Sequence, residues 1–328
     1  MNRITPNIAS AVELLKKGLP VAIPTETVYG LAANAFDKQA VSKIFELKKR
    51  PLFNPLIVHL RKDAELDEIA VEIPSNARML AERFWPGPLT LVLKKSEVIP
   101  DIVTAGKSTV ALRKPEHPIA QMLLDRLDFP LAAPSANPFG SISPTRSSHV
   151  DLMFGSELKL ILEGGACTYG IESTIVGFEG EEAILYRLGA ISKEEIEELI
   201  GPINTITKAE IPLAPGMLDR HYSPKTPAFL VENPSAWTEK VSRWKVGYLL
   251  FSEQIPYIDP NSQYILSHQR NFKTAMNRLY AAMHDMDSKG FDLILCERFP
   301  ESSIGSSIND RLQRACGNEN DITHIINK

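Results

Sequence analysis

The sequence predicts an α/β protein of about two domains, and three observations support this class. The chain has 328 residues, more than a single domain usually contains. Short apolar runs alternate with longer segments of helical periodicity, as expected for sheets covered by helices. A proline-rich stretch, 201–227, interrupts this alternation, because proline is excluded from helix interiors and central strands. We therefore expect a first domain at 1–200, a linker at 201–227 and a C-terminal α/β domain at 228–328.

In the first domain, apolar runs predict strands and amphipathic runs predict helices. Thr5 and Pro6 are suited to begin a first helix that ends before Gly18. Asp37 and Ser75 are suited to cap further helices, and a capping box begins the last one. The predicted strands are 21–23, 56–60, 89–93, 108–113, 131–133, 158–162 and 183–187. The other predicted helices are 37–48, 63–70, 75–84, 118–127, a short one from Ser143, and 193–200 with Ser192 and Glu195 as its capping box.

The second domain repeats this alternation on a smaller scale. Buried strands are predicted at 229–231, 246–251 and 291–295, with a helix at 271–288 whose apolar face we interpret as core. This order predicts a small, mostly parallel, Rossmann-like sheet. The linker before it carries aromatic and basic groups, including Tyr222, that a plain spacer does not need. A long connection with such content is typical of a lid.

Composition narrows the class of protein. Hydrophobic content of 44% and charged content of 23% are ordinary for a globular enzyme. A net charge of −4 argues against a nucleic-acid binder that uses its whole surface, although a local basic cleft is compatible with it. The three cysteines are widely separated, which predicts no disulfide framework and suits a reducing cytoplasm. The N-terminus lacks the apolar core of a signal peptide, and we expect a cytoplasmic protein without membrane contact.

One basic stretch, 48–59, stands out as a candidate ligand loop. Pro51 and Pro55 restrict their own backbone and that of the preceding residues, so the chain cannot remain helical there. Lys48, Arg50 and Asn54 are then held on a stiff loop, and His59 lies near the end of the next strand. Two cations, an amide and an imidazole suit an anionic ligand. The alternative is a solvated helix C-terminus, where basic residues complement the helix dipole.

Polar side chains also follow other predicted strands. Thr27 lies in the polar run 24–31 after the first strand, at the usual ligand position of an α/β sheet. Arg113 ends a strand and is interpreted either as an ion-pair anchor or as a ligand clamp. Ser143 begins the predicted short helix, whose exposed N–H groups would attract phosphate.

Together these motifs resemble one family, the YrdC-like threonylcarbamoyl-AMP synthases in their two-domain form. The resemblance covers the first domain and the linker almost entirely, whereas the C-terminal domain matches by position more than by motif. The segments that carry it are 24–31, 48–59, 85–90, 133–137, 143–145, 170–174 and 215–224.

The resemblance implies an activity, a fold and partners. The activity is that of a nucleotidyltransferase, which joins L-threonine, bicarbonate and ATP to give L-threonylcarbamoyladenylate and pyrophosphate. The product serves the N6-threonylcarbamoyl modification of adenosine 37 in tRNA. The implied fold is an open twisted mixed sheet with a concave positive cleft. Mg²⁺ would bind through the ATP phosphates, with no metal ligand from the protein. The implied partners are tRNA-modification proteins that consume the intermediate, and a weak direct contact with tRNA or double-stranded RNA is left open.

The resemblance also implies roles for single residues. The residues similar to threonine-contacting positions are Thr27, His59, Arg113, Ala133 through its backbone, and Ser173. Those similar to ATP- or adenylate-contacting positions are Arg50, Asn54, Thr109, Ser135, Ser143, Arg187 and Tyr222. We expect Lys48 and Arg50 to act electrostatically, because attack of a threonine carbamate on the α-phosphorus needs no enzyme nucleophile.

Some positions depart from the family pattern, and two other functions are alternatives to the synthase. Glu163, Leu188 and Ala214 differ from the residues common there, but none of them removes a charge. One alternative function is an RNA-binding module without chemistry; the acidic balance and the 7% aromatic content argue against it. The other is carbamoyl transfer from another carbamate, which the threonine-like positions and the linker motif argue against.

Overall fold

The computed structural model describes residues 3–206, 214–216 and 221–326 of the chain. It divides into two units, one comprising Met1–Phe139 and Ser143–Leu218, the other Gly140–Ile142 and Asp219–Lys328. One boundary between the units, after Leu218, falls within the stretch predicted as a linker, whereas the short segment Gly140–Ile142 is grouped with the second unit. Residues 207–213 and 217–220 of that stretch lie outside the described residues.

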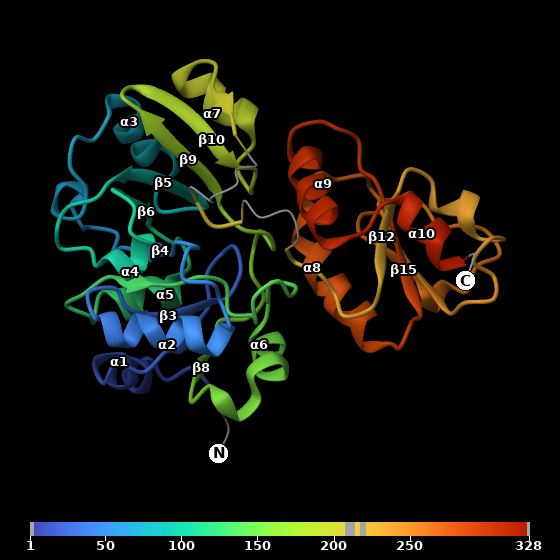
Figure 1. Ribbon diagram of the computed structural model, residues 1–328, viewed down its shortest axis with the longest axis horizontal. Coiled ribbons are helices and arrows are strands. Elements are labelled where there is room, and N and C mark those ends of the chain that lie inside the picture. Colours follow the sequence, from blue (N-terminus) through green and yellow to red (C-terminus); the bar gives the residue numbers. More distant parts are fainter. Residues whose placement is uncertain (1–2, 207–213, 217–220, 327–328) are drawn as a thin grey trace. The chain divides into compact units, whose positions relative to one another are not determined.

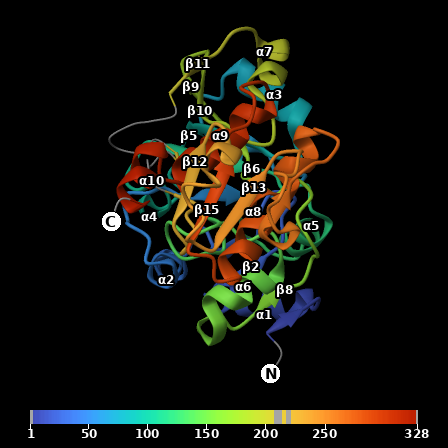
Figure 2. The same ribbon diagram turned by 90° about the vertical axis from the view of Figure 1, so that its right-hand side faces the viewer.

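The first unit is built on a mixed sheet that has eleven strands in the described part of the chain. Their order is β1-β8-β2-β3-β7-β4-β6-β5-β9-β10-β11, with both parallel and antiparallel neighbours, as in β4–β6 and β5–β6. The N-terminal strand lies beside β8 and α6 in both views (Figures 1 and 2). The strands are β1 (Ile4–Thr5), β2 (Val21–Ile23), β3 (Gly30–Asn34), β4 (Ile57–His59), β5 (Leu89–Lys94), β6 (Thr109–Arg113), β7 (Leu131–Ala132), β8 (Ile161–Leu162), β9 (Thr174–Glu179), β10 (Glu182–Arg187) and β11 (Asn204–Thr205).

The two faces of this sheet carry different apolar clusters. Alternate strand residues such as Val58 and Leu112 join a large core with helices from one side. Residues of the opposite parity form two smaller clusters. Ile57 and Ala111 belong to one that Ala214 completes, whereas Ile23 and Leu131 belong to another that packs against helices 8–16 and 118–124. Figure 1 shows α3 and α7 beside β5, β9 and β10. The helices of this unit are α1 (Ile8–Lys16), α2 (Lys38–Lys48), α3 (Ser75–Phe84), α4 (Asp101–Thr104), α5 (Pro118–Leu124), α6 (Ser147–Phe154) and α7 (Lys193–Ile200), with 3-10 turns η1 (Leu66–Glu68) and η2 (Gly155–Glu157).

The second unit contains a parallel sheet, and the mixed α/β prediction is confirmed for both units. Its strand order is β12-β15-β13-β14, and each pair of neighbouring strands is parallel. Met276, Leu279 and Met283 of α8 are buried, as predicted for a core-facing helix. The elements are β12 (Ala228–Val231), η3 (Pro234–Trp237), β13 (Val246–Leu250), η4 (Pro260–Ser262), β14 (Gln263–Ile265), α8 (Phe272–Ser288), β15 (Leu293–Glu297), α9 (Ile304–Ala315) and α10 (Glu319–Ile326).

Three local predictions are wrong, in each case because backbone groups there form hydrogen bonds with a distant segment of the chain. Thr5 belongs to β1, which pairs with β8, and Asn7 caps the first helix instead. The predicted helix 63–70 is reduced to the turn η1, because Val71 donates its N–H to the carbonyl of Lys94. No helix begins at Ser143; the neighbouring carbonyl of Pro144 accepts from the N–H of Tyr29, and α6 starts four residues later.

Ser75 is the first residue of α3 and not its cap, whereas Asp37 accepts from two N–H groups of α2 as predicted. Among the described residues, no helix combines the length and the apolar character needed to cross a bilayer.

The capping box of α7 yields a stability prediction. The Ser192 hydroxyl accepts from the N–H of Glu195, whose carboxylate accepts from the N–H of Ser192. Ser192→Ala should lower the free energy of unfolding of this unit by about 1 kcal/mol. The measurement is urea unfolding followed by Trp85 fluorescence, with Trp237 and Trp244 of the second unit replaced by Phe.

The matched control is Ser10→Ala within α1, where alanine is the better helix former. Its free energy of unfolding should change by no more than about 0.5 kcal/mol. Equal losses in the two variants would contradict the capping role of Ser192.

Candidate functional site

The pairing of neighbouring strands places most predicted site residues on one face of the first sheet. His59 at the end of β4 lies opposite Arg113 at the end of β6. Residues paired in register share a face, as do alternate residues of one strand, so Thr109 lies on this face as well. The pairing of β6 with β5, of β5 with β9 and of β9 with β10 places Thr90 and Arg187 on the same face. This is the face of the apolar cluster that Ala214 completes, away from the large core.

Arg113 is held by three hydrogen bonds from its guanidinium group. Its Nη2 donates to Glu26 Oε1 at 2.5 Å, its Nη1 to Thr27 Oγ1 at 2.8 Å and its Nε to the Gly87 carbonyl at 3.2 Å. Both partners of the ion pair are buried. The anchor interpretation of Arg113 is therefore confirmed. These contacts use one N–H of each guanidinium nitrogen, so the second N–H of each terminal nitrogen remains for a ligand carboxylate.

His59 is a neutral imidazole in this setting. Burial, together with the positive charge of Arg113, lowers the pKa of His59 to about 3. Its Nδ1 has no hydrogen-bond partner among the residues that the structure describes. Buried polar atoms of this kind are uncommon in proteins and call for a partner. A ligand on this face would supply one.

Ser173 is held by a network that reaches the linker. Its hydroxyl lies 2.7 Å from Thr90 Oγ1, and Arg187 donates to its carbonyl and to its hydroxyl. Arg187 Nη1 also donates to the carbonyl of Pro215 at 3.1 Å. A Cβ on Gly189 would lie 2.3 Å from the backbone nitrogen of Thr174, so only glycine allows this close approach.

The two cations Lys48 and Arg50 of the basic stretch are buried, so the alternative of a solvated helix end is wrong for them, although Leu52 and Phe53 in the same loop are exposed. Lys48 is 1% exposed and its amino group donates to the carbonyls of Ser135, at 2.5 Å, and Asn137. Burial, with the nearby charge of Arg50, lowers the pKa of Lys48 well below its usual range. Arg50 Nη2 donates to Asn54 Oδ1 at 2.6 Å and to the carbonyl of Pro55 at 2.8 Å. These hydrogen bonds and the two prolines together fix the conformation of the loop.

The remaining predicted residues occupy several places. The N–H of Ala133 donates to the carbonyl of Ile57, so a ligand contact there would fall to the Ala133 carbonyl. Ser143 donates to Glu172 Oε1 at 2.6 Å. Thr109 and Ser135 are both half-buried near strand ends. Tyr222 belongs to the second unit, where its ring packs near Tyr280, Arg311 and His221.

Sequence reasoning missed three buried partners of the predicted residues, which are Glu26, Thr90 and Glu172. Each lies within a motif segment, but spacing alone gives no sign of its partner. Glu26 and Arg113, for example, are joined by a hydrogen bond across 87 positions.

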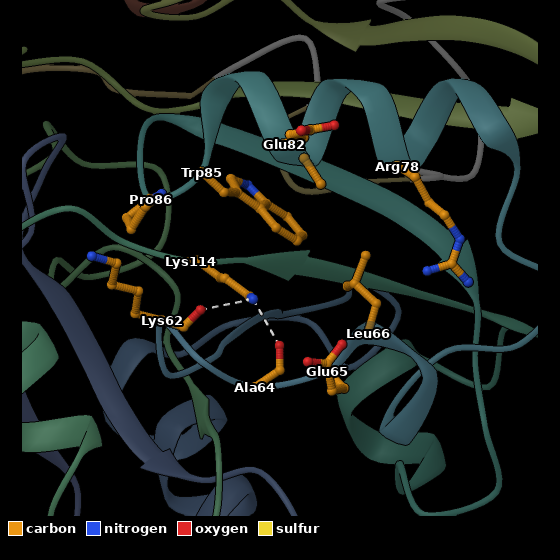
Figure 3. A pocket seen from close by; sticks show the side chains of 10 residues that line it. Lys62, Ala64, Glu65, Leu66, Arg78, Glu82, Trp85, Pro86 and Lys114 are labelled. Carbon is orange, nitrogen blue, oxygen red and sulfur yellow. Dashed lines mark hydrogen bonds between the residues drawn. The ribbon is translucent and has the colours of Figure 1, made fainter.

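A hollow of about 310 Å³ is lined by residues of α3 and of the segments that hold Trp85, Pro86 and Lys114 (Figure 3). Trp85 forms one wall, and Lys114 donates to the carbonyls of Lys62 at 2.9 Å and Ala64 at 2.7 Å. The Lys114 carbonyl accepts from the N–H of Gly87. Trp85 and Pro86 line the hollow, and the next residue, Gly87, binds Arg113 through its carbonyl. The lining residues themselves differ from the predicted site residues.

The fold and this polar face define an α/β protein of the YrdC-like class. A family model described as telomere recombination matches residues 13–189, and a model for the threonylcarbamoyl-AMP synthase C-terminal domain matches 191–317. The chain belongs to this family of YrdC-like threonylcarbamoyl-AMP synthases, in the two-domain form that the motifs predict.

Individual relatives agree with this assignment. The chain is 41% identical to threonylcarbamoyl-AMP synthase of Pyrococcus abyssi, over 94% of each chain. It is 38% identical to that of Bacillus subtilis, over 95% of this chain and 93% of the relative. The crystal structure of P. abyssi Sua5 complexed with L-threonine matches with a TM-score of 0.88 at 39% identity, over 95% of both chains.

The depressed pKa of His59 predicts a pH dependence of stability. In the unfolded chain this histidine takes up a proton near pH 6.5, whereas in the folded chain it does so only near pH 3. Between these values the unfolded state binds more protons, so the free energy of unfolding falls by about 1.4 kcal/mol per unit of decreasing pH from this group alone. His59→Gln should remove this part of the slope, measured by urea unfolding with the Trp85 readout. Equal slopes in both proteins would contradict a buried neutral His59.

Proposed function

We propose that this chain forms L-threonylcarbamoyladenylate from L-threonine, bicarbonate and ATP and releases pyrophosphate. Family membership supports an enzyme of this kind, and a relative that matches 95% of the chain binds L-threonine in its crystal structure. The observation that carries the proposal is the convergence of Arg113, His59 and Thr109 on one face of the sheet. That face joins the residues predicted for an amino acid to those predicted for a nucleotide.

The balance of buried charge fits an anionic ligand. In the described part of the first unit, the buried charged side chains are Lys48, Arg50, Arg113 and Arg187 on the cationic side, and Glu26 and Glu172 on the anionic side. The cationic excess suits ATP, which carries about four negative charges with Mg²⁺ as its usual companion. Among the described residues, no group of three or more His, Cys, Asp or Glu side chains is placed to hold a metal. We propose that Mg²⁺ binds through the ATP phosphates.

For L-threonine, the geometry supports a carboxylate bound by the second N–H groups of Arg113, whose orientation the other contacts fix. Thr27 and Ser173 offer hydroxyls of suitable size for its polar groups. Neutral His59 can offer L-threonine either an N–H donor or a nitrogen acceptor without adding charge. Ala133 can offer its carbonyl as an acceptor.

For ATP, the proposed contacts are donors. Asn54 Nδ2 is buried without a partner among the described residues, which makes it available to a phosphate or ribose oxygen. Arg50 lies beside it, and Arg187 flanks Ser173. The further residues assigned to the nucleotide are Thr109, Ser135, Ser143 and Tyr222.

The chemistry needs no covalent intermediate on the enzyme. The threonine amine captures bicarbonate with loss of water, or carbon dioxide with loss of a proton; the resulting carbamate attacks the α-phosphorus, and pyrophosphate leaves. The protein contributes position and charge, with Lys48 holding the 135–137 loop through two carbonyls. The mixed anhydride hydrolyses readily in water, so a linker acting as a lid would protect it.

The product is proposed to serve N6-threonylcarbamoylation of adenosine 37 in tRNA. Its chemistry requires a partner that transfers the threonylcarbamoyl group to the base. We propose that cytoplasmic tRNA-modification proteins take over the intermediate from this chain.

The proposed reaction predicts a strict co-substrate requirement. Pyrophosphate release from ATP should require both L-threonine and bicarbonate, and omission of either should reduce it to the background level. Arg50→Ala should abolish release, whereas Arg61→Ala, in an exposed arginine paired with Asp63, should leave it unchanged. Release at full rate without threonine would contradict the proposed function.

The Ser173 network predicts a second effect. Thr90→Val keeps the shape of the side chain but removes the oxygen 2.7 Å from the Ser173 hydroxyl. The affinity for L-threonine should fall about threefold to tenfold, the cost of one neutral hydrogen bond. Thr90→Ser, which keeps the hydroxyl, should stay within about twofold of the unaltered chain. Isothermal titration calorimetry measures both values, and full affinity in Thr90→Val would show that Ser173 needs no orientation by Thr90.

A further inference from the structure

Glu26 is a buried carboxylate of which one oxygen is used and the other is not. It is 2% exposed, and its Oε1 accepts from Arg113 Nη2 at 2.5 Å. Its Oε2 has no hydrogen-bond partner among the described residues. A carboxylate oxygen left unpaired in the interior costs more than an ordinary hydrogen bond contributes, so such an atom calls for a ligand.

The backbone around Glu26 holds this carboxylate in place. The carbonyl of Glu26 accepts from the N–H of Tyr169 at 2.8 Å, and the Thr25 hydroxyl accepts from the N–H groups of Thr27 and Val28. The turn is therefore fixed on both sides of residue 26. Glu26 lies directly beside Thr27, and both bind the same guanidinium.

We propose that Glu26 is the residue that selects for the α-amino group of the substrate, with Oε2 accepting a hydrogen bond from it. This inference rests on the proposed function, because it places an amino acid at Arg113. Arg113 and Glu26 then present a cation and an anion side by side. An amino acid presents a carboxylate and an ammonium group at the same close spacing.

The charge balance of the pair explains the selectivity. A lone buried arginine would accept any carboxylate, including hydroxy acids that lack nitrogen. With Glu26 present, a ligand without a donor leaves Oε2 unpaired in the interior, which is penalised strongly. A ligand with an α-amino group satisfies both atoms at once.

The test compares L-threonine with (R)-3-hydroxybutanoate, which has the same carbon skeleton, hydroxyl and carboxylate but no amine. Titration calorimetry without ATP should show that the unaltered chain binds L-threonine at least about tenfold more tightly. Glu26→Gln keeps the size and an acceptor for Arg113 but removes the charge. It should weaken L-threonine about 10-fold to 100-fold and leave the analogue within about threefold of its original affinity.

The matched control is Glu163→Gln, a change of the same chemistry in a carboxylate that binds Ser147 and the N–H of Gly165. It should leave both affinities unchanged. Equal weakening of both ligands in Glu26→Gln would overturn this inference alone, because Glu26 would then only orient Arg113. If Glu26→Gln fails to fold, the comparison of the two ligands in the unaltered chain decides, and equal affinities there overturn the inference. Failure of the unaltered chain to bind L-threonine would overturn the proposed function as well.

Discussion

The buried ion pair between Arg113 and Glu26 is the interaction on which the polar face depends. Arg113 ends β6, Glu26 lies in the loop after β2, and the Gly87 carbonyl that also binds Arg113 precedes β5. One guanidinium therefore joins three segments that are far apart in the sequence. Burial of two charges is offset only when direct contact and further hydrogen bonds satisfy them, and here three of the five N–H groups of Arg113 have protein partners. Removal of either charge would leave the other unpaired in the interior.

The division of the sheet into two faces gives this ion pair its surroundings. Alternate residues of β4, β5 and β6 enter the large core, while Ile57, Val92 and Ala111 form an apolar floor on the other side. Polar groups at the strand ends, such as His59 and Arg113, border that floor. In such a setting electrostatic contacts are stronger than in water, which suits a reaction that depends on position and charge.

Local sequence signals predicted the elements whose causes are local. Asp37 caps α2 and the 192–195 capping box begins α7, because each needs only neighbouring backbone N–H groups. The predicted helix start at Thr5 and the predicted helix 63–70 are wrong, because backbone pairing with distant segments overrides local preference. The motifs identified the candidate site residues. The role of Glu26 as the partner of Arg113 was missed, because nothing in their sequence spacing links the two residues. The two interpretations of Arg113 were also inseparable from sequence, because an anchor and a clamp require the same residue at the same strand end.

The concave positive cleft and the nucleotide assignments stay predictions. One experiment would locate both substrates. It is a crystal structure of this chain with L-threonine and a non-hydrolysable ATP analogue. We expect the threonine carboxylate within hydrogen-bond distance of Arg113, on the face that carries His59, with the α-phosphate on the same face. Threonine bound elsewhere, with the polar face around Arg113 free of both ligands, would contradict it.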